Sequence, residues 1–390
     1  MHASVHHITA SAEELRAEAL SSDELGRLTD RTVEILRASE GMKLMQAKDL
    51  GGFEAHPNDF FDWVMAVGEA HPSAGWVAGV VGIHPWQISI MDPLVQDEIY
   101  GADPEVWVAS PYAPFGRLVP VEGGYRFTGR WPYSTGTDHA RWIILGGLLA
   151  DESGAPVAPG RMCHVVLPRS GYEVVPDSWN VLGLRGTGSK DVIVDGAFIP
   201  EHRVSWAEQM YDYTYAKERR PETPLYQMGF GLMFPAAIAA GTFGIARNAL
   251  AVFEETMASR ISTAGTVAKT SPLQLDALAR ARADVEASIC HQQSIVARLH
   301  EQVEGGVDID TEQRIAFRRD QVRATSRCVA AVDDLFRFAG SGSMNSGHPV
   351  ERVWRDLHVA ATHICNITEA VYQGWGAQRF GAPLPPGFTY

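Results

Sequence analysis

The sequence has little cysteine and no pattern that would tie its cysteines together. Four occur among 390 residues, with no CxxC pair and no spacing typical of a metal site. In a chain of this length, such sparse cysteines are typical of reduced core residues in a reducing compartment. The N-terminus also lacks the basic-then-apolar pattern of a signal peptide. We therefore expect a cytoplasmic protein with no metal site and with free thiols at Cys163, Cys290, Cys328 and Cys365.

The chain also lacks an excess of positive charge and a long apolar run. Its 33 lysines and arginines stand against 47 aspartates and glutamates, which gives a formal net charge of −14. A protein that binds nucleic acid would carry a basic face, so nucleic acid is not an expected partner. A few local arginines can still bind a small anion. No apolar run reaches the roughly 18 to 20 residues that span a bilayer, so we expect no membrane segment.

What is present changes in character twice along the chain. Residues 1–104 carry apolar residues at helical spacing, whereas 105–220 carry short β-rich runs between turn glycines. Four long helical segments then follow, at about 228–259, 274–304, 311–339 and 349–376, with glycine-rich breaks. We predict an α+β, mostly α fold. It comprises an N-terminal helical domain (1–104), a central antiparallel β-barrel or sandwich (105–220) and a C-terminal four-helix bundle (221–390).

A helical stretch in the first segment combines small residues with a tryptophan and a histidine. Alanine or glycine stands at positions 74, 75, 78, 79 and 82, which allows close approach of another backbone or of a ligand. Trp76 and His84 are eight residues apart, about two helical turns, so we expect them near one face. With Trp86 and Phe230, these positions suggest a roomy apolar cavity.

Several motifs together carry a resemblance to a known family. They are SAGWVAGVVGIHPW (73–86), ASPYAPFG (109–116), GRWPYSTGTDHARW (129–142), GLRGTGSKDV (183–192), RRDQVRAT (318–325) and ERVWRDLH (351–358). Because the motifs occur in this order, the chain resembles the acyl-CoA dehydrogenase superfamily over nearly its whole length. More closely, it resembles the oxygenase components of two-component flavin-dependent aromatic (phenol) monooxygenases, of the para-hydroxyphenylacetate and secosteroid phenol hydroxylase type.

The resemblance implies a reaction, a cofactor and a partner. Such enzymes receive reduced FMN or FAD from a separate flavin reductase and react it with O2. The resulting C4a-hydroperoxyflavin hydroxylates a phenolic or polycyclic aromatic substrate, while the protein excludes water. The resemblance also implies a homotetramer with flavin sites between chains. Oxidation of nitrogen or sulfur on the same fold is a less favoured variant of this reading.

By resemblance, a hydroxyl of GRWPYSTGTDHARW faces flavin N5, and the sequence leaves Ser134 and Thr135 as alternatives. Ser110 resembles a serine near flavin and substrate. Trp76 and His84 are expected to face the substrate, with His84 able to hydrogen-bond the phenol. The alternative in each case is structural: turn hydroxyls, a serine at a strand end, or a core histidine.

His363 is the strongest candidate for proton transfer. By position, the catalytic glutamate of an acyl-CoA dehydrogenase would fall near Ile364, where this chain has no carboxylate. A histidine can instead accept the phenolic proton and so activate the ring. The predicted catalytic set is therefore His363, His84, Ser134 and Thr135. An acyl-CoA dehydrogenase and a flavin-free scaffold protein remain the alternative functions, and a structural histidine is the alternative role for His363.

Four further residues are predicted to contact the cofactor. Arg260 and Arg323 stand on long helical segments and could bind phosphate, because guanidinium groups suit bidentate phosphate contacts. Gly340 and Ser341 open a GSGSMN run that lacks the third glycine of a Rossmann motif. The alternative is that these arginines belong to solvated helix faces.

Overall fold

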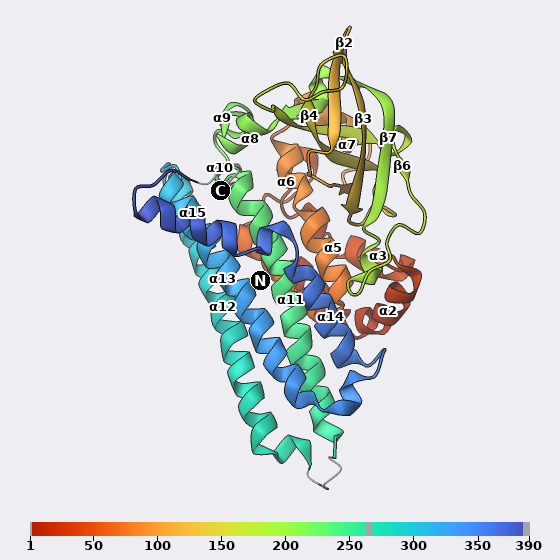
Figure 1. Ribbon diagram of the computed structural model, residues 1–390, viewed down its shortest axis with the longest axis vertical. Helices are drawn as coiled ribbons and strands as arrows, with labels where there is room; N and C mark the ends of the chain where they lie inside the picture. The colour runs from red at the N-terminus through yellow and green to blue at the C-terminus, as the bar shows by residue number, and fades with distance from the viewer. Residues whose placement is uncertain (1, 262–264, 266, 385–390) are drawn as a thin grey trace.

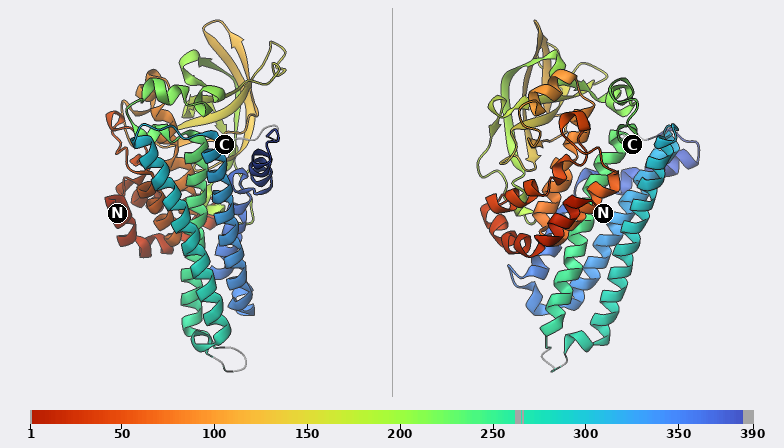
Figure 2. Two further views of the ribbon diagram at one scale, coloured as in Figure 1. Left: turned by 90° about the vertical axis from the view of Figure 1, so that its left-hand side faces the viewer. Right: turned by 180° about the vertical axis from the view of Figure 1, so that it is seen from behind.

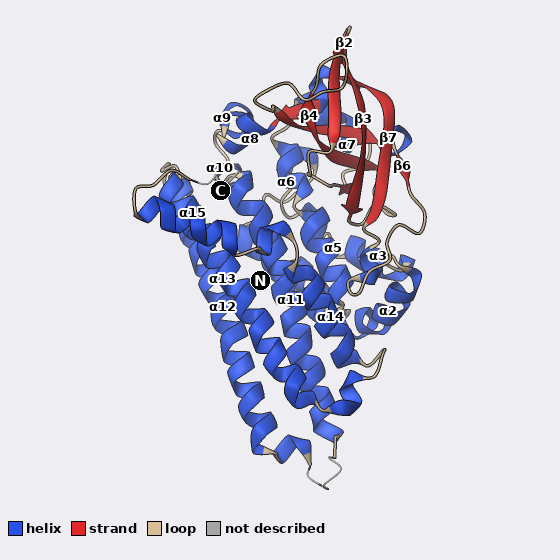
Figure 3. Ribbon diagram, in the orientation of Figure 1, coloured by secondary structure: helices blue, strands red, loops and turns tan. Residues whose placement is uncertain are grey.

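The computed structural model describes residues 2–261, 265 and 267–384. Long helices form the lower part of the molecule, and a sheet lies at its upper end (Figures 1 and 3). The helices before the sheet are α1 (Ala3–Ala10), α2 (Ala12–Leu25), α3 (Asp30–Ala38), α4 (Pro57–Ala70), α5 (Pro72–Gly82), α6 (His84–Ser89) and α7 (Pro93–Tyr100). Helices α1–α5 lie beside the long helices and below the sheet (Figure 2), whereas α7 lies at the level of the sheet and shares a hydrophobic cluster with its strands (Figure 1).

Eight strands form one sheet in the order β6-β7-β3-β2-β4-β5-β8, with β1 paired to β4. Their bounds are β1 (Val108–Ala109), β2 (Gly116–Val121), β3 (Gly124–Ser134), β4 (Trp142–Leu149), β5 (Met162–Pro168), β6 (Glu173–Val174), β7 (Lys190–Pro200) and β8 (Val204–Trp206). Two pairings, β1 with β4 and β2 with β4, are parallel. The prediction of a purely antiparallel domain is therefore wrong. The sheet is mixed, because β1 and β2 both run parallel to their neighbour β4.

Helices resume after the sheet. They are α8 (Ala207–Tyr211), α9 (Thr214–Arg219), α10 (Pro224–Gln227), α11 (Phe230–Ser259), α12 (Pro272–Glu304), α13 (Thr311–Ala339), α14 (Pro349–Ala361) and α15 (Glu369–Arg379). The bounds of α11, α12 and α13 agree with the predicted segments within two residues. The fourth predicted segment is wrong as one helix, because the chain breaks after Ala361 and passes through a short 3-10 turn, Ile364–Asn366.

The small residues of α5 serve helix packing. A Cβ added to Gly75 would lie 2.2 Å from the Cα of Gly68 on α4, and one added to Gly79 would lie 2.8 Å from the carbonyl oxygen of Ala237 on α11. Larger residues would therefore separate α5 from both neighbours. The space that the sequence suggested for a ligand is occupied at these positions by other helix backbones.

One hydrophobic core joins the N-terminal helices to the bundle, since buried residues of α1–α6 and of α10–α14 belong to the same cluster. All named strands lie between Val108 and Trp206. The predicted boundaries at 104 and 220 remain predictions.

Two composition-based expectations need correction. By length and composition α11 could cross a membrane, although the sequence suggested no such stretch, and 83% of its apolar window is buried inside the protein. Of the four free cysteines, three are buried as expected, but Cys290 is exposed on α12.

Candidate functional site

Aromatic rings join the four predicted substrate residues at the sheet end of α11. The ring of Tyr112 lies 5.7 Å from His84 and 5.1 Å from Phe234, and Phe234 lies 6.0 Å from His363. Trp76 meets the other side of His363 edge-on at 5.6 Å. Trp76 and His84 belong to two helices, α5 and α6, and not to two turns of one helix as predicted. They nevertheless reach the same aromatic cluster.

His84 and Ser110 form a buried pair. The Nδ1–H of His84 donates to the carbonyl oxygen of Val108, which can only accept, so Nε2 must accept from the Ser110 hydroxyl at 2.9 Å. His84 is fully buried, and this burial lowers its pKa to about 4. The ring is therefore neutral near pH 7, and both of its nitrogens are engaged within the chain.

A second buried network lies beside this pair and was missed in the sequence. The Tyr112 hydroxyl donates to Gln87 Oε1 at 2.7 Å, and Gln87 Nε2 donates to His164 Nδ1 at 2.8 Å. The ring of His164 stacks on Tyr112 at 4.6 Å. Its buried Nε2 has no hydrogen-bond partner in the described structure. His164 stands alone in the apolar strand β5, and nothing in the sequence separated it from an ordinary core histidine.

His363 lies in the break between α14 and α15. Its Nδ1 accepts a hydrogen bond from the backbone N–H of Cys365 at 3.2 Å, which caps the short 3-10 turn. Burial, and secondarily the positive charge of Arg318, lower the pKa of His363 to about 4. The break contains no aspartate or glutamate between Ala361 and Glu369. It thus presents an imidazole to the aromatic cluster without a carboxylate beside it.

The structure distinguishes Ser134 from Thr135. Tyr133 has a left-handed φ of 68° at a β-bulge near the end of β3, and its side chain is exposed. Ser134 follows with its hydroxyl buried and without a hydrogen-bond partner in the described structure. The Thr135 hydroxyl is 2.9 Å from that of Ser189. Ser134 therefore has an unsatisfied buried hydroxyl, whereas the hydroxyl of Thr135 is engaged.

Two buried carboxylates hold the loop that carries Thr187 and Ser189. Asp356 of α14 accepts from the Leu184 N–H at 2.6 Å, and Asp23 of α2 accepts from the Gly186 N–H at 3.3 Å. Burial, with repulsion from Asp23, raises the pKa of Asp356 to about 7. Glycines at 183 and 186 let the loop backbone approach α14 and α2 closely, because a Cβ there would collide with these helices. Packing therefore explains the GLRGTGS run, and no phosphate-binding role is needed.

The predicted phosphate residues lie elsewhere. Arg260 follows α11 and donates to the carbonyl oxygen of Ala339, and its guanidinium lies against Gly340, next to Ser341. Since α11 has 30 residues, this group is ~45 Å from Phe230 at the other end of the helix. Arg323 is exposed on α13, midway along the bundle. Within a single chain, therefore, none of the predicted phosphate-binding residues lies at the aromatic cluster.

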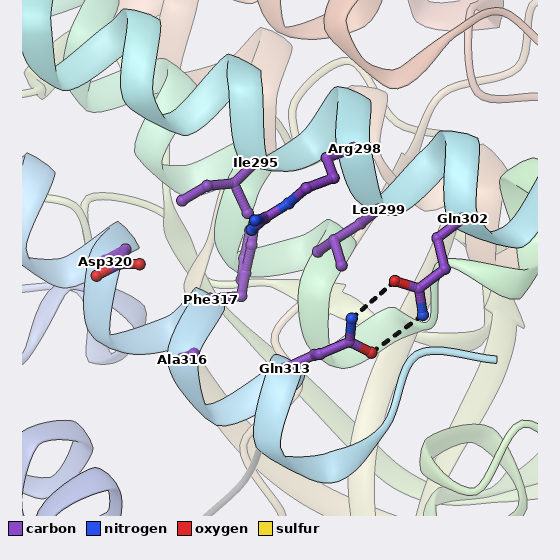
Figure 4. Close-up of a pocket in the computed structure, with 8 residues that line it drawn as sticks. All are labelled: Ile295, Arg298, Leu299, Gln302, Gln313, Ala316, Phe317 and Asp320. Atoms are coloured by element: carbon purple, nitrogen blue, oxygen red, sulfur yellow. Dashed lines mark hydrogen bonds between the residues drawn. The ribbon is translucent and has the colours of Figure 1, made fainter. Parts of the chain in front are cut away.

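A cavity of about 200 Å³ lies between α12 and α13, where Gln302 and Gln313 exchange hydrogen bonds at 3.0 and 2.7 Å (Figure 4). A second, more polar cavity of about 390 Å³ lies between α13 and the start of α15. Neither is lined by a predicted site residue. We therefore base the site on the aromatic cluster and its hydrogen bonds.

Comparisons with known proteins agree with this architecture. The family model for the acyl-CoA dehydrogenase C-terminal domain matches residues 236–367. A pigment production hydroxylase from Rhodococcus erythropolis is 39% identical over 97% of this chain and 96% of its own. The oxygenase subunit HsaA of a flavin-dependent monooxygenase from Mycobacterium tuberculosis is 36% identical over 96% and 94%.

The solved structure of 3-HSA hydroxylase from Rhodococcus sp. RHA1 superimposes with a TM-score of 0.92. It is 34% identical and covers 98% of both chains. The fold, the missing carboxylate and these similarities point the same way, and the acyl-CoA dehydrogenase alternative is set aside. The chain belongs to the family of oxygenase components of flavin-dependent monooxygenases, built on the acyl-CoA dehydrogenase fold.

Proposed function

We propose that this enzyme hydroxylates a phenolic ring held in the aromatic cluster between His363 and the His84–Ser110 pair. As a flavin-dependent oxygenase component it uses reduced flavin and O2, and this implies a flavin reductase as partner. One observation carries the proposal: residues from α5, α6, the β1 end and the α14–α15 break converge on the cluster, with no carboxylate in that break.

The buried hydroxyl of Ser134 supports a flavin contact. A buried hydroxyl without a partner costs free energy unless a ligand satisfies it, and a flavin nitrogen would do so. Thr135 needs no ligand, because its hydroxyl is bonded to Ser189. We therefore assign the flavin-facing role to Ser134. Bound reduced flavin supplies the oxygen chemistry, which the protein must shield from water.

Ser110 is suited to accept a hydrogen bond from the substrate. The Ser110 hydroxyl donates its hydrogen bond to His84 Nε2, so its oxygen can still accept one from a substrate hydroxyl. His84 has both nitrogens engaged, so in this arrangement it orients Ser110 and does not bind the phenol itself. This role explains why a neutral histidine is buried beside a serine at the end of β1.

His363 is suited to take the phenolic proton at Nε2. The neutral ring has its proton on Nε2, because Nδ1 accepts from Cys365. To act as a base, it must shift that proton to Nδ1 and give up a hydrogen bond worth about 1 kcal/mol. General base catalysis typically accelerates a reaction 10²- to 10⁴-fold, which lowers the activation free energy by about 3 to 5 kcal/mol. The cost of the lost hydrogen bond is small beside this gain.

We also propose a homotetramer in which another chain completes the flavin site. Arg260, Gly340 and Ser341 are too far from Ser134's side of the molecule to contact one flavin together with the cluster in the same chain. Large apolar side chains are exposed on both sides of α15: Ile364, in the break before it, is 76% exposed and Phe380, directly after it, is 90% exposed. Such exposure supports a protein contact there.

The decisive test supplies chemically reduced FMN or FAD, ¹⁸O2 and a panel of monocyclic and bicyclic phenols. We expect a hydroxylated product with one ¹⁸O, measured by mass spectrometry, and none from reduced flavin alone. Recovery of all the consumed O2 as H2O2 with every phenol would contradict the proposal. Light scattering on the same preparation tests the tetramer separately.

A further inference from the structure

Arg318 is a buried cation without a counter-ion among the residues that the structure describes. It lies on α13 with 5% of its surface exposed. Its Nη1 donates to Gln321 Oε1 and to the carbonyl oxygen of Cys365, the latter at 3.1 Å. Within the described residues no carboxylate pairs with it, and its Nε and Nη2 have no hydrogen-bond partner. The neighbouring Arg319, by contrast, pairs with Asp320 at 2.7 Å.

The groups around Arg318 are all uncharged near neutral pH. Burial raises the pKa of Tyr211 to about 12 and that of Cys365 to about 11, so both stay protonated. Burial beside Arg318 keeps His363 neutral. Gln321 passes the hydrogen-bond chain to Asn366 at 3.1 Å. An arginine does not deprotonate in proteins, so Arg318 keeps its positive charge, and no group in the described part of the chain balances it.

A buried charge without a counter-ion is costly, and a ligand anion beside it would recover that cost. The position of Arg318 indicates which ligand this is. Tyr211 reaches the aromatic cluster through Phe230, at 6.2 Å, and Cys365 is two residues from His363. The guanidinium is thus linked to the same cluster in two ways: through Tyr211, with which it interacts electrostatically, and through the Cys365 carbonyl beside His363.

We infer that Arg318 is the anion-binding residue of the substrate site and selects aromatic compounds that present a negatively charged oxygen to it. That oxygen is either the phenolate formed when the phenolic proton moves to His363, or a carboxylate on the ring. In the first case the proton passes from oxygen to nitrogen, and the charge left on the oxygen is balanced by the guanidinium. This inference rests on the proposed function, because it assumes that the cluster takes an aromatic substrate.

Equilibrium binding to the flavin-free protein tests this inference without turnover. The probes are 4-nitrophenol, whose ionised form is coloured, 4-nitrobenzoate, and uncharged nitrobenzene. We expect wild type to bind 4-nitrophenol as the anion and to lower its apparent pKa. Arg318→Met should weaken binding of an anionic probe about 10- to 100-fold and leave nitrobenzene within about twofold. Loss of 4-nitrophenolate alone identifies the phenolate as the anion, and loss of 4-nitrobenzoate alone identifies a ring carboxylate.

Two controls separate charge from structure. Arg337→Met removes an exposed arginine from the same helix and should change no binding constant. Arg318→Lys should restore part of the anion affinity. Because Arg318→Met removes an unpaired charge, its melting temperature should not fall.

The inference is overturned if Arg318→Met binds both anions as tightly as wild type, or loses nitrobenzene equally. It is also overturned if wild type binds inorganic phosphate in a manner that depends on Arg318 but binds neither anionic probe. Hydroxylation by the wild-type enzyme with reduced flavin is measured separately. A wild type that hydroxylates phenols while Arg318→Met keeps its anion affinity would sink this inference alone.

Discussion

The two ends of α11 differ in how much of a site one chain can build. At the sheet end, Phe230 and Phe234 contact aromatic rings from α6, β5 and α8 and from the connecting segments that hold Tyr112 and His363. Buried hydrogen bonds join several polar groups there, although His164 Nε2 has no partner in the described structure. At the far end, Arg260 and Gly340 form a half-exposed contact at the end of the bundle (Figure 1). One chain thus builds most of a site at the sheet end. At the far end, a site would need further residues from another chain.

The largest effect should come from the sheet end. Replacing His363 by Asn keeps a polar side chain that can accept from the Cys365 N–H but removes the base. We expect hydroxylated product to fall at least ~100-fold, since general base catalysis contributes roughly this much. Product is measured by chromatography per reduced flavin supplied. His291→Asn, exposed on α12, is the matched control. A loss under tenfold for His363→Asn would leave His363 with a structural role only.

A smaller effect should separate two neighbouring hydroxyls. Ser134→Ala removes the unsatisfied hydroxyl, and we expect a several-fold rise in the fraction of O2 recovered as H2O2. Thr135→Ala breaks the bond to Ser189 and should lower the free energy of unfolding by about 1 kcal/mol without changing that fraction. Peroxide yield and denaturant unfolding are measured on both variants. The opposite pattern would move the flavin contact to Thr135.

At the far end the expected change is in flavin affinity alone. Arg260→Ala should weaken binding of reduced flavin about tenfold, as expected when a charged hydrogen bond is lost. The products formed at saturating flavin should stay the same, because the aromatic cluster is intact. Fluorescence titration measures the affinity, with Arg280→Ala, exposed on α12, as the control. Equal affinity in an intact tetramer would remove Arg260 from the flavin site.

The last prediction concerns stability and not the reaction: it tests the contact of Asp356 with the 183–189 loop. Because the pKa of Asp356 is raised to about 7 in the fold and lies near 4 in the unfolded chain, the folded protein keeps a proton that the unfolded chain has lost. Stability should therefore be full below pH 4 for this group and fall as pH rises from about 4 to 7.

Asp356→Asn removes this dependence while keeping an oxygen for the Leu184 N–H. We expect the variant to gain on the order of 2 kcal/mol over wild type between pH 5 and pH 8, since each pKa unit is ~1.4 kcal/mol. Urea unfolding at the two pH values measures it. Asp308→Asn, an exposed partner of Lys217, is the control. The same pH slope in Asp356→Asn and wild type would show that the carboxyl ionises freely.

The residues on which the proposed site rests could be named from sequence because their motifs are local, and their roles remain predictions. Trp76, His84, Ser110 and His363 were named from short stretches of sequence, and the fold brings them to one cluster. The choice between Ser134 and Thr135 could not be made, since both are turn hydroxyls in sequence. It depends on Ser189, 54 residues away, which bonds only one of them.

The sequence by itself determined the succession of helices, strands and helices and the bounds of α11, α12 and α13, because periodicity, caps and glycines act locally. It also determined that no carboxylate stands near position 364. Tertiary structure decided the rest: the parallel pairing around β4, the break at His363 and the burial of Arg318 without a counter-ion. Each depends on partners distant in the chain, since strand neighbours, desolvation and charge compensation are properties of packing and not of local sequence.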